Sequence, residues 1–285
     1  MCTLQSTRGI ILCDLNETIL SPQNKLTVPL EDFSSCIARA QQSGFVVGLC
    51  SDSSFQTLTE YAAMFDMKGP LVVEQGAAYA LSKDYQPFAI LHETKIFPSI
   101  RDAFLSILTL QKHDNPYHII CGDANRIVED PNQFASANNG DIMIAVNGLR
   151  QFSFSFFVRR RMDGKWVHDP HKLREIEKVA RAVGSFLSTW SDVVIDRNDH
   201  YGICIFHYKS TSKTNGVECI LQTLGKFPLH MIGDSTADHL ELKGVSHYAV
   251  ANAKVEYKQH CNHIATHPFT EGVIDLIHFI IDHQN

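Results

Sequence analysis

The chain has 285 residues, of which 44% are hydrophobic and 20% charged, and its formal net charge is −6 at pH 7. These values exclude a disordered chain, and the acidic balance argues against nucleic acid or an anionic membrane surface as the main partner. No apolar run approaches the roughly 18 residues of a membrane-spanning helix. The apolar run before Asp14 is also too short for a signal peptide, and the eight cysteines form no CxxC pair, so we expect a cytoplasmic protein with reduced thiols.

The first 83 residues alternate between strand and helix patterns. Continuous apolar runs predict buried strands over 9–14 and 45–50 and a strand with a turn over 70–78. Apolar residues at helical spacing predict helices that begin near Pro29 and near Phe55. Successive β-α-β units predict a parallel sheet with right-handed crossovers.

The middle of the chain has a different pattern. Apolar and polar residues alternate over 141–146, 152–160 and 201–206, which predicts an antiparallel sheet with one solvated face. Helices are predicted near 98–111 and from Asp169-Pro170 onward. Residues 84–207 are therefore predicted to form an inserted α+β domain.

The β-α pattern returns near residue 208. A helix is predicted over 214–224, strands over 229–232, 247–250 and 263–266, and a last helix near the C-terminus. The predicted fold class is α/β, with a doubly wound, mostly parallel sheet. Residues 1–83 and 208–285 would build this core, which the inserted domain splits.

Polar residues follow several of the core strands. They are Asp14 after the first, Ser51 and Asp52 after the second, and Asp234 to Asp238 after 229–232, while Lys213 begins a helix. Ligands of open parallel sheets bind beyond the carboxyl ends of the strands. Clustered carboxylates repel one another unless a cation lies among them, and hard oxygen ligands favour Mg²⁺. A lysine and a hydroxyl can hold phosphate, and a carboxylate can attack phosphorus to give an aspartyl-phosphate, so this set indicates phosphoryl transfer.

Four motifs in order resemble those of the haloacid dehalogenase (HAD) superfamily. DLNET (14–18) resembles its first motif, DxDxT, and the strand ending in Ser51 resembles the second. Lys213 matches the lysine of the third, and GDSTAD (233–238) resembles the fourth, GDxxxD. VVEQGA (72–77) and YAVANA (248–253) are similar to segments of the Cof-type and sugar-phosphatase branch, whose members carry a large α/β cap between motifs two and three.

The resemblance implies a role for each matching residue. Asp14 would be the nucleophile and a magnesium ligand, and Asn16 would offer its backbone carbonyl to the metal. Asp234 would be the second carboxylate ligand. Asp238 beside it would also belong to the metal site, either as a direct ligand or as a partner of the ligands. The phosphoryl group would be held by Ser51, its neighbour Asp52 and Lys213. The implied function is a magnesium-dependent phosphatase or phosphotransferase acting on a small phosphorylated metabolite, with sugar phosphates the first expectation.

Asn16 departs from the family pattern. The family's phosphatases usually carry an aspartate there, which protonates the leaving oxygen and then activates water. Losing a general acid-base group typically costs about 10²–10⁴ in rate. Three explanations stay open: a natural site for an easy leaving group or slow transfer, a pseudophosphatase that binds but hardly turns over, or an engineered variant. A dehalogenase is a weaker alternative, because its members usually lack the GDxxxD segment.

Structural readings of the same residues also stay open. Asp234 and Asp238 could simply cap the following helix, and Ser53 rivals Ser51 for the position in the second motif. The basic run RRRMDGK (159–165) could bind an anion, but Asp163-Gly164 favours a hairpin turn with solvated arginines.

Overall fold

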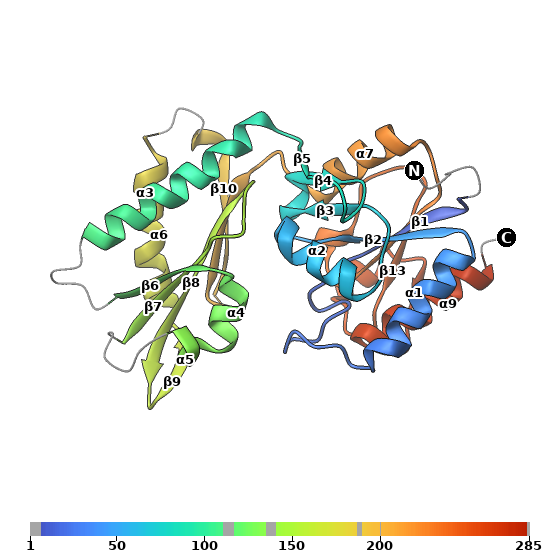
Figure 1. Ribbon diagram of the computed structural model, residues 1–285, viewed down its shortest axis with the longest axis horizontal. Helices are drawn as coiled ribbons and strands as arrows, with labels where there is room; N and C mark the ends of the chain where they lie inside the picture. Colours follow the sequence, from blue (N-terminus) through green and yellow to red (C-terminus); the bar gives the residue numbers. More distant parts are fainter. Residues whose placement is uncertain (1–6, 111–116, 135–140, 187–189, 200, 284–285) are drawn as a thin grey trace. The chain divides into compact units, whose positions relative to one another are not determined.

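A computed structural model describes residues 7–110, 117–134, 141–186, 190–199 and 201–283. The chain divides into two compact units (Figure 1). Unit 1 comprises Met1–Ile90 and Thr211–Asn285, and unit 2 comprises Leu91–Ser210.

Unit 1 is built on an eight-stranded sheet with the order β14-β13-β12-β1-β2-β3-β4-β5. The strands from β14 to β3 pair in parallel, and β4 and β5 add antiparallel at one edge. This confirms the predicted mostly parallel α/β sheet. The strands are β1 (Gly9–Cys13), β2 (Phe45–Cys50), β3 (Leu71–Val73), β4 (Ala78–Ala80), β5 (Phe88–Ala89), β12 (Leu229–Gly233), β13 (Val245–Ala249) and β14 (His263–Ile264).

Helices cover both faces of this sheet (Figure 1). Ile10 and Leu12 of β1 pack in one core cluster with Val217 and Ile220 of α7 (Lys213–Leu224). On the other face, α1 (Leu30–Gln42) contacts β2 and α9 (Phe269–His283). Both faces of β1 are buried, which explains its continuous apolar run. The remaining helices of unit 1 are α2 (Phe55–Met64), α8 (Val255–Lys258) and the short 3₁₀ turns η2 (Glu74–Gly76) and η6 (Thr236–Asp238).

Unit 2 holds a second sheet, with the order β10-β11-β8-β7-β6 and with β9 paired to β8. Helices α3 (Phe97–Leu110) and α6 (Pro170–Gly184) bury one face in an aromatic cluster that includes Phe104, Phe154 and Phe156. Helix α4 (Ala124–Glu129) packs against the other face. The other elements are β6 (Tyr117–Gly122), α5 (Pro131–Phe134), β7 (Ile142–Asn147), β8 (Phe154–Met162), β9 (Lys165–His168), β10 (Val193–Asn198), β11 (Ile203–Tyr208), η3 (His92–Ile96) and η5 (Trp190–Asp192).

The prediction that this second sheet is antiparallel is wrong for one pair of strands. β6 and β7 pair in parallel, with Tyr117 opposite Ile142, and α4 lies between them in the chain. The side chains of β6 are mostly half-buried, so the strand shows no strong apolar pattern. α4 has six residues, too few for a helical period, and the crossover was therefore missed.

The basic run forms the predicted hairpin. β8 and β9 pair with Met162 opposite Lys165, and Asp163 and Gly164 both adopt left-handed φ angles, 49° and 78°. Such angles are typical of a type I′ turn. Among the helices in the described ranges, none combines the length and apolar character needed to cross a bilayer.

The buried histidine His230 in unit 1 should make the protein less stable in mild acid. Burial lowers the pKa of His230 from 6.5 to about 4. Between pH 6.5 and about pH 4, His230 is protonated more readily in the unfolded chain than in the folded protein. The free energy of unfolding therefore falls as the pH drops through this range. At pH 5 the expected loss is about 2 kcal/mol relative to pH 7. Urea unfolding at pH 7 and pH 5 measures this loss in the unchanged protein and in His230→Leu, where the loss should be smaller. An equal loss in both proteins would contradict the assignment to His230.

Candidate active site

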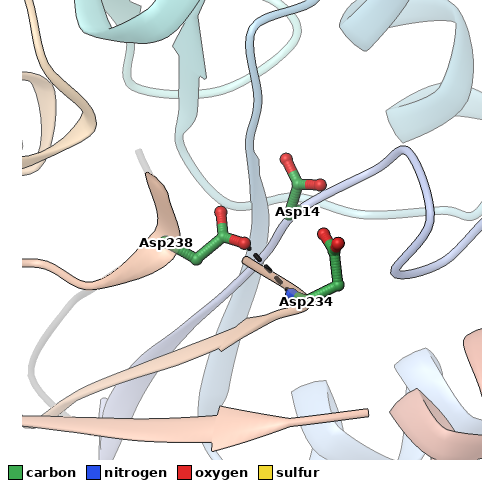
Figure 2. Close-up of side chains that lie close together, drawn as sticks. All are labelled: Asp14, Asp234 and Asp238. Atoms are coloured by element: carbon green, nitrogen blue, oxygen red, sulfur yellow. Dashed lines mark hydrogen bonds between the residues drawn. The ribbon is translucent and has the colours of Figure 1, made fainter. Parts of the chain in front are cut away.

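Three aspartate side chains gather where two neighbouring strands of unit 1 end (Figure 2). Asp14 follows β1 and Asp234 follows β12, and these strands pair in parallel with Cys13 opposite Ile232. The Asp14 amide donates to the Ile232 carbonyl at 2.9 Å, which fixes the start of the side chain. Asp14, Asp234 and Asp238 each offer one carboxylate oxygen within 4.8 Å of the others. Parallel pairing therefore makes residues 14 and 234 neighbours in space.

Lys213 links two of these carboxylates. Its ammonium nitrogen lies 2.7 Å from Asp14 Oδ1 and 2.6 Å from Asp238 Oδ1, and its side chain is buried. Lys213 is the first residue of α7, directly after the cap residue Ser212. Gly76, at φ 81°, allows the η2 turn to approach this helix start, because a Cβ there would lie 1.8 Å from the Ser212 carbonyl oxygen. Close packing of the η2 turn against the start of α7 thus sets the position of the lysine.

Asp238 folds back onto the loop from which it comes. Its Oδ2 accepts hydrogen bonds from the backbone amides of Asp234 and Ser235, both at 3.1 Å. A Cβ on Gly233 would lie 2.4 Å from that same oxygen, so this turn requires glycine. Since Oδ1 contacts Lys213, both oxygens of Asp238 bind groups of the protein. Asp238 therefore supports the Asp234 backbone and the lysine.

Burial and neighbouring charges shift the pKa values of the ionisable groups in this site. Burial, with a further contribution from Asp238, raises the pKa of Asp234 to about 6 against the pull of Lys213. Burial also raises the pKa of Asp14, and Lys213 opposes that rise. Burial alone would lower the pKa of Lys213, but the Asp14 and Asp238 carboxylates outweigh it and raise that pKa well above its usual value.

The donor set fits a hard divalent cation. Three carboxylates against one ammonium group leave negative charge uncompensated in a buried place. Carboxylate oxygens are the ligands that Mg²⁺ prefers. Asp14 and Asp234 could hold such an ion, because Asp238 is already bonded through both oxygens.

The end of β2 brings hydroxyl groups towards Asn16. The Asn16 side-chain amide donates to Ser53 Oγ at 3.3 Å, and the Ser51 hydroxyl lies 3.4 Å from the same oxygen. Ser51 and Ser53 are buried, and Asp52 between them is half-buried. In the described part of the chain, the acid cluster does not include Asp52.

Two further side chains connect the loops of the site. Thr18 donates through Oγ1 to Asp234 Oδ1 at 3.2 Å, and Asn252 donates through Nδ2 to the Glu17 carbonyl at 2.7 Å. Sequence reasoning gave neither residue a contact in the site. Their signals were present but weak: Thr18 is the last residue of the first motif, and Asn252 follows β13 at the same edge of the sheet.

Replacing Asp234 with Asn should weaken cation binding. The change removes one buried negative charge but leaves a carbonyl oxygen to accept the Thr18 hydrogen bond. We expect Mn²⁺, as a Mg²⁺ substitute, to bind about a hundredfold more weakly, since removing even an outer partner of a ligand typically costs 10- to 100-fold. Isothermal titration calorimetry measures the affinity, with the surface variant Asp282→Asn as control. Equal Mn²⁺ affinity in Asp234→Asn and the unchanged protein would exclude Asp234 as a ligand.

Comparisons with known proteins agree on the fold. A family model described as haloacid dehalogenase-like hydrolase matches residues 11–277. A haloacid dehalogenase-like hydrolase from Bacteroides thetaiotaomicron is a similar solved structure, with a TM-score of 0.64 and 16% identity over 96% of this chain and 100% of that one. A sugar phosphatase of HAD subclass IIB has a TM-score of 0.58 and 13% identity, with coverage of 96% and 99%. A trehalose-6-phosphate phosphatase related protein has a TM-score of 0.58 and 12% identity, with coverage of 96% and 97%. No curated protein matches the chain.

Proposed function

The chain belongs to the haloacid dehalogenase-like hydrolase family, and from this premise we propose that it is a magnesium-dependent phosphatase or phosphotransferase. The observation that carries the proposal is the meeting of Asp14, Asp234 and Lys213 at one edge of the unit 1 sheet. The substrate would be a small phosphorylated metabolite. A sugar phosphate is the first candidate, supported by the sugar phosphatase of HAD subclass IIB among the structures of similar fold.

In this proposal Asp14 is the nucleophile. Its carboxylate attacks the phosphorus atom of the ester, an aspartyl-phosphate forms, and the bond from phosphorus to the bridging oxygen breaks. The departing alkoxide takes its proton from solvent water and leaves as the alcohol. The Lys213 ammonium, 2.7 Å from Asp14, and the Ser51 hydroxyl would hold the phosphoryl oxygens, with Asp52 beside them. Water then attacks the acyl phosphate to release inorganic phosphate and restore Asp14.

The cation would be held by the Asp14 and Asp234 carboxylates and the backbone carbonyl of Asn16. Bound there, Mg²⁺ would supply charge stabilisation for the phosphoryl oxygens. Asp238 would support this site by fixing Lys213 and the Asp234 amide, since its oxygens contact both.

The Asn16 side chain limits both half-reactions. An amide neither gives a proton to the leaving alcohol nor takes one from the attacking water. Its Nδ2 instead donates to Ser53 Oγ at 3.3 Å. We therefore infer slow turnover. For an ester whose leaving group is easily displaced, the first half-reaction needs no acid, so the second half-reaction is the slower one.

A second candidate function is motivated by the same residue. A protein of this fold that binds a phosphorylated ligand without turning it over would act in binding or regulation. Asn16 removes the acid-base group while the contacts of Asp14 with Lys213 stay in place, which is compatible with such a role.

Steady-state assays with a panel of phosphate esters test the proposal. We expect phosphate release that requires Mg²⁺, is suppressed by a chelator, and is strongest for sugar phosphates or for esters with good leaving groups. Binding of the esters without any release, in the presence of Mg²⁺, would favour the non-catalytic candidate. If the protein neither binds nor cleaves any ester of the panel, both candidate functions are contradicted.

A further inference from the structure

The loop after β1 contains a strained backbone residue. Glu17 has φ 58°, in the left-handed region that residues with a Cβ rarely adopt. It lies between Asn16 and Thr18, whose hydroxyl contacts Asp234 Oδ1. The path of this loop therefore affects how Asp14 and Asp234 are spaced, and something must hold Glu17 in its unfavourable conformation.

Asn252 uses both ends of its side-chain amide next to this residue. Its Nδ2 donates to the Glu17 carbonyl at 2.7 Å, and its Oδ1 accepts from the Phe269 amide at 2.9 Å. Phe269, the first residue of α9, is itself left-handed, with φ 50°. One amide thus joins two strained backbone positions that lie more than 200 residues apart in sequence. Thr270 adds a second tie, because its hydroxyl donates to the Ile19 carbonyl at 2.6 Å.

The segment that carries Asn252 also holds the other acid-bearing loop. The Lys254 amide donates to the Asp234 carbonyl at 2.8 Å, and the Val250 amide donates to the Gly233 carbonyl at 3.3 Å. Residues 250–254 therefore form hydrogen bonds with the backbone of both acid-bearing loops, the one after β1 and the one after β12. A rigid link of this kind keeps two ligand-bearing loops at a fixed separation, as outer partners of metal ligands commonly do.

We propose that Asn252 is a positioning residue: it holds Glu17 in its left-handed conformation and so sets the spacing between the carboxylates of Asp14 and Asp234. The inference rests on the cation site of the proposed function. It predicts that loss of the Asn252 contact weakens cation binding, and that the loss disappears when residue 17 adopts a left-handed φ without strain. Glycine does so, because it has no Cβ.

A double-mutant cycle tests this link, with Mn²⁺ affinity measured by isothermal titration calorimetry. Asn252→Ala should raise the Mn²⁺ dissociation constant by about tenfold. Asn252→Asp keeps an oxygen for the Phe269 amide but removes the donor to Glu17, and it should cause a similar loss although its charge attracts cations. In a Glu17→Gly background, Asn252→Ala should cost about twofold or less.

Glu17→Gln is the matched control for charge, because the Glu17 carboxylate acts on Asp234 and the glycine change removes it. In the Glu17→Gln background Asn252→Ala should keep its full tenfold effect, which would separate strain from charge. The amide hydrogens of residues 15–20 should exchange faster in Asn252→Ala than in the unchanged protein. In the double variant, which also carries Glu17→Gly, their exchange should slow again.

Three results would overturn the inference. In the first, Asn252→Ala binds Mn²⁺ as tightly as the unchanged protein while melting at a lower temperature, which is the result of a merely structural contact. In the second, the loss is as large with Gly at position 17 as with Glu. In both cases the unchanged protein still binds Mn²⁺ and the proposed function stands. In the third, the unchanged protein binds no Mn²⁺, and the proposed function fails together with the inference.

Discussion

Asn16→Asp should raise the rate of phosphate release by about 10²–10⁴. The new carboxylic acid can protonate the leaving oxygen as its bond to phosphorus breaks, and the resulting carboxylate can then take a proton from the attacking water. The side chain keeps its shape, and Ser53 Oγ, now 3.3 Å from the amide nitrogen, can donate to the new carboxylate. The measurement is kcat with and without Mg²⁺ on the best ester of the panel.

The gain should depend on position, not on charge alone. Asn262→Asp makes the same chemical change elsewhere in unit 1 and keeps the oxygen that accepts the His247 amide at 2.8 Å, so it should leave kcat unchanged. If the unchanged protein is active and Asn16→Asp has the same kcat, residue 16 is not the acid-base position. A protein inactive in both forms would contradict the enzyme proposal itself.

Asp14→Asn should abolish turnover, with an expected loss on the order of 10⁶ when a covalent nucleophile is removed. The buried ammonium of Lys213 keeps a carboxylate partner in this variant, because Asp238 Oδ1 lies 2.6 Å away. We therefore expect the variant to fold. The loss should appear in kcat for Asp14→Asn alone and for Asp14→Asn combined with Asn16→Asp.

Intact-protein mass spectrometry after an acid quench gives a second readout of the same prediction. Since Asn16 slows hydrolysis of the acyl phosphate, the unchanged protein should carry one phosphoryl group during turnover of an ester with a good leaving group, and Asp14→Asn should carry none. Asp66→Asn is a suitable control, because Asp66 is exposed, has φ 54°, and asparagine tolerates that angle. Residual turnover in Asp14→Asn would exclude Asp14 as the nucleophile.

Buried parallel strands were the part of the fold most open to prediction. The runs over 9–13 and 45–50 are apolar throughout because both faces of these strands are covered, and the structure places β1 and β2 there. Pro29 located the start of α1 within one residue: it is the cap and not the first helical position. β6 was missed because half-buried side chains carry no strong pattern.

The candidate site was predictable to the extent that topology determines it. Parallel strands present their carboxyl ends at one edge, so Asp14, Ser51 and Asp234 were expected to converge, and the structure brings Asp14 and Asp234 together. The contacts that refine the site were not predictable. Glu17 gives no glycine signal for its left-handed φ, and the bond from Asn252 to its carbonyl spans 235 positions. Such contacts depend on the packed loops and not on any local pattern.

Crystals grown with Mn²⁺ and a phosphate mimic would test the central claim most directly, because anomalous scattering locates the ion without ambiguity. We expect one anomalous peak between the carboxylates of Asp14 and Asp234, with the mimic next to Asp14 and within reach of Lys213. A map without a peak at these two carboxylates, from a protein saturated with Mn²⁺, would contradict the central claim.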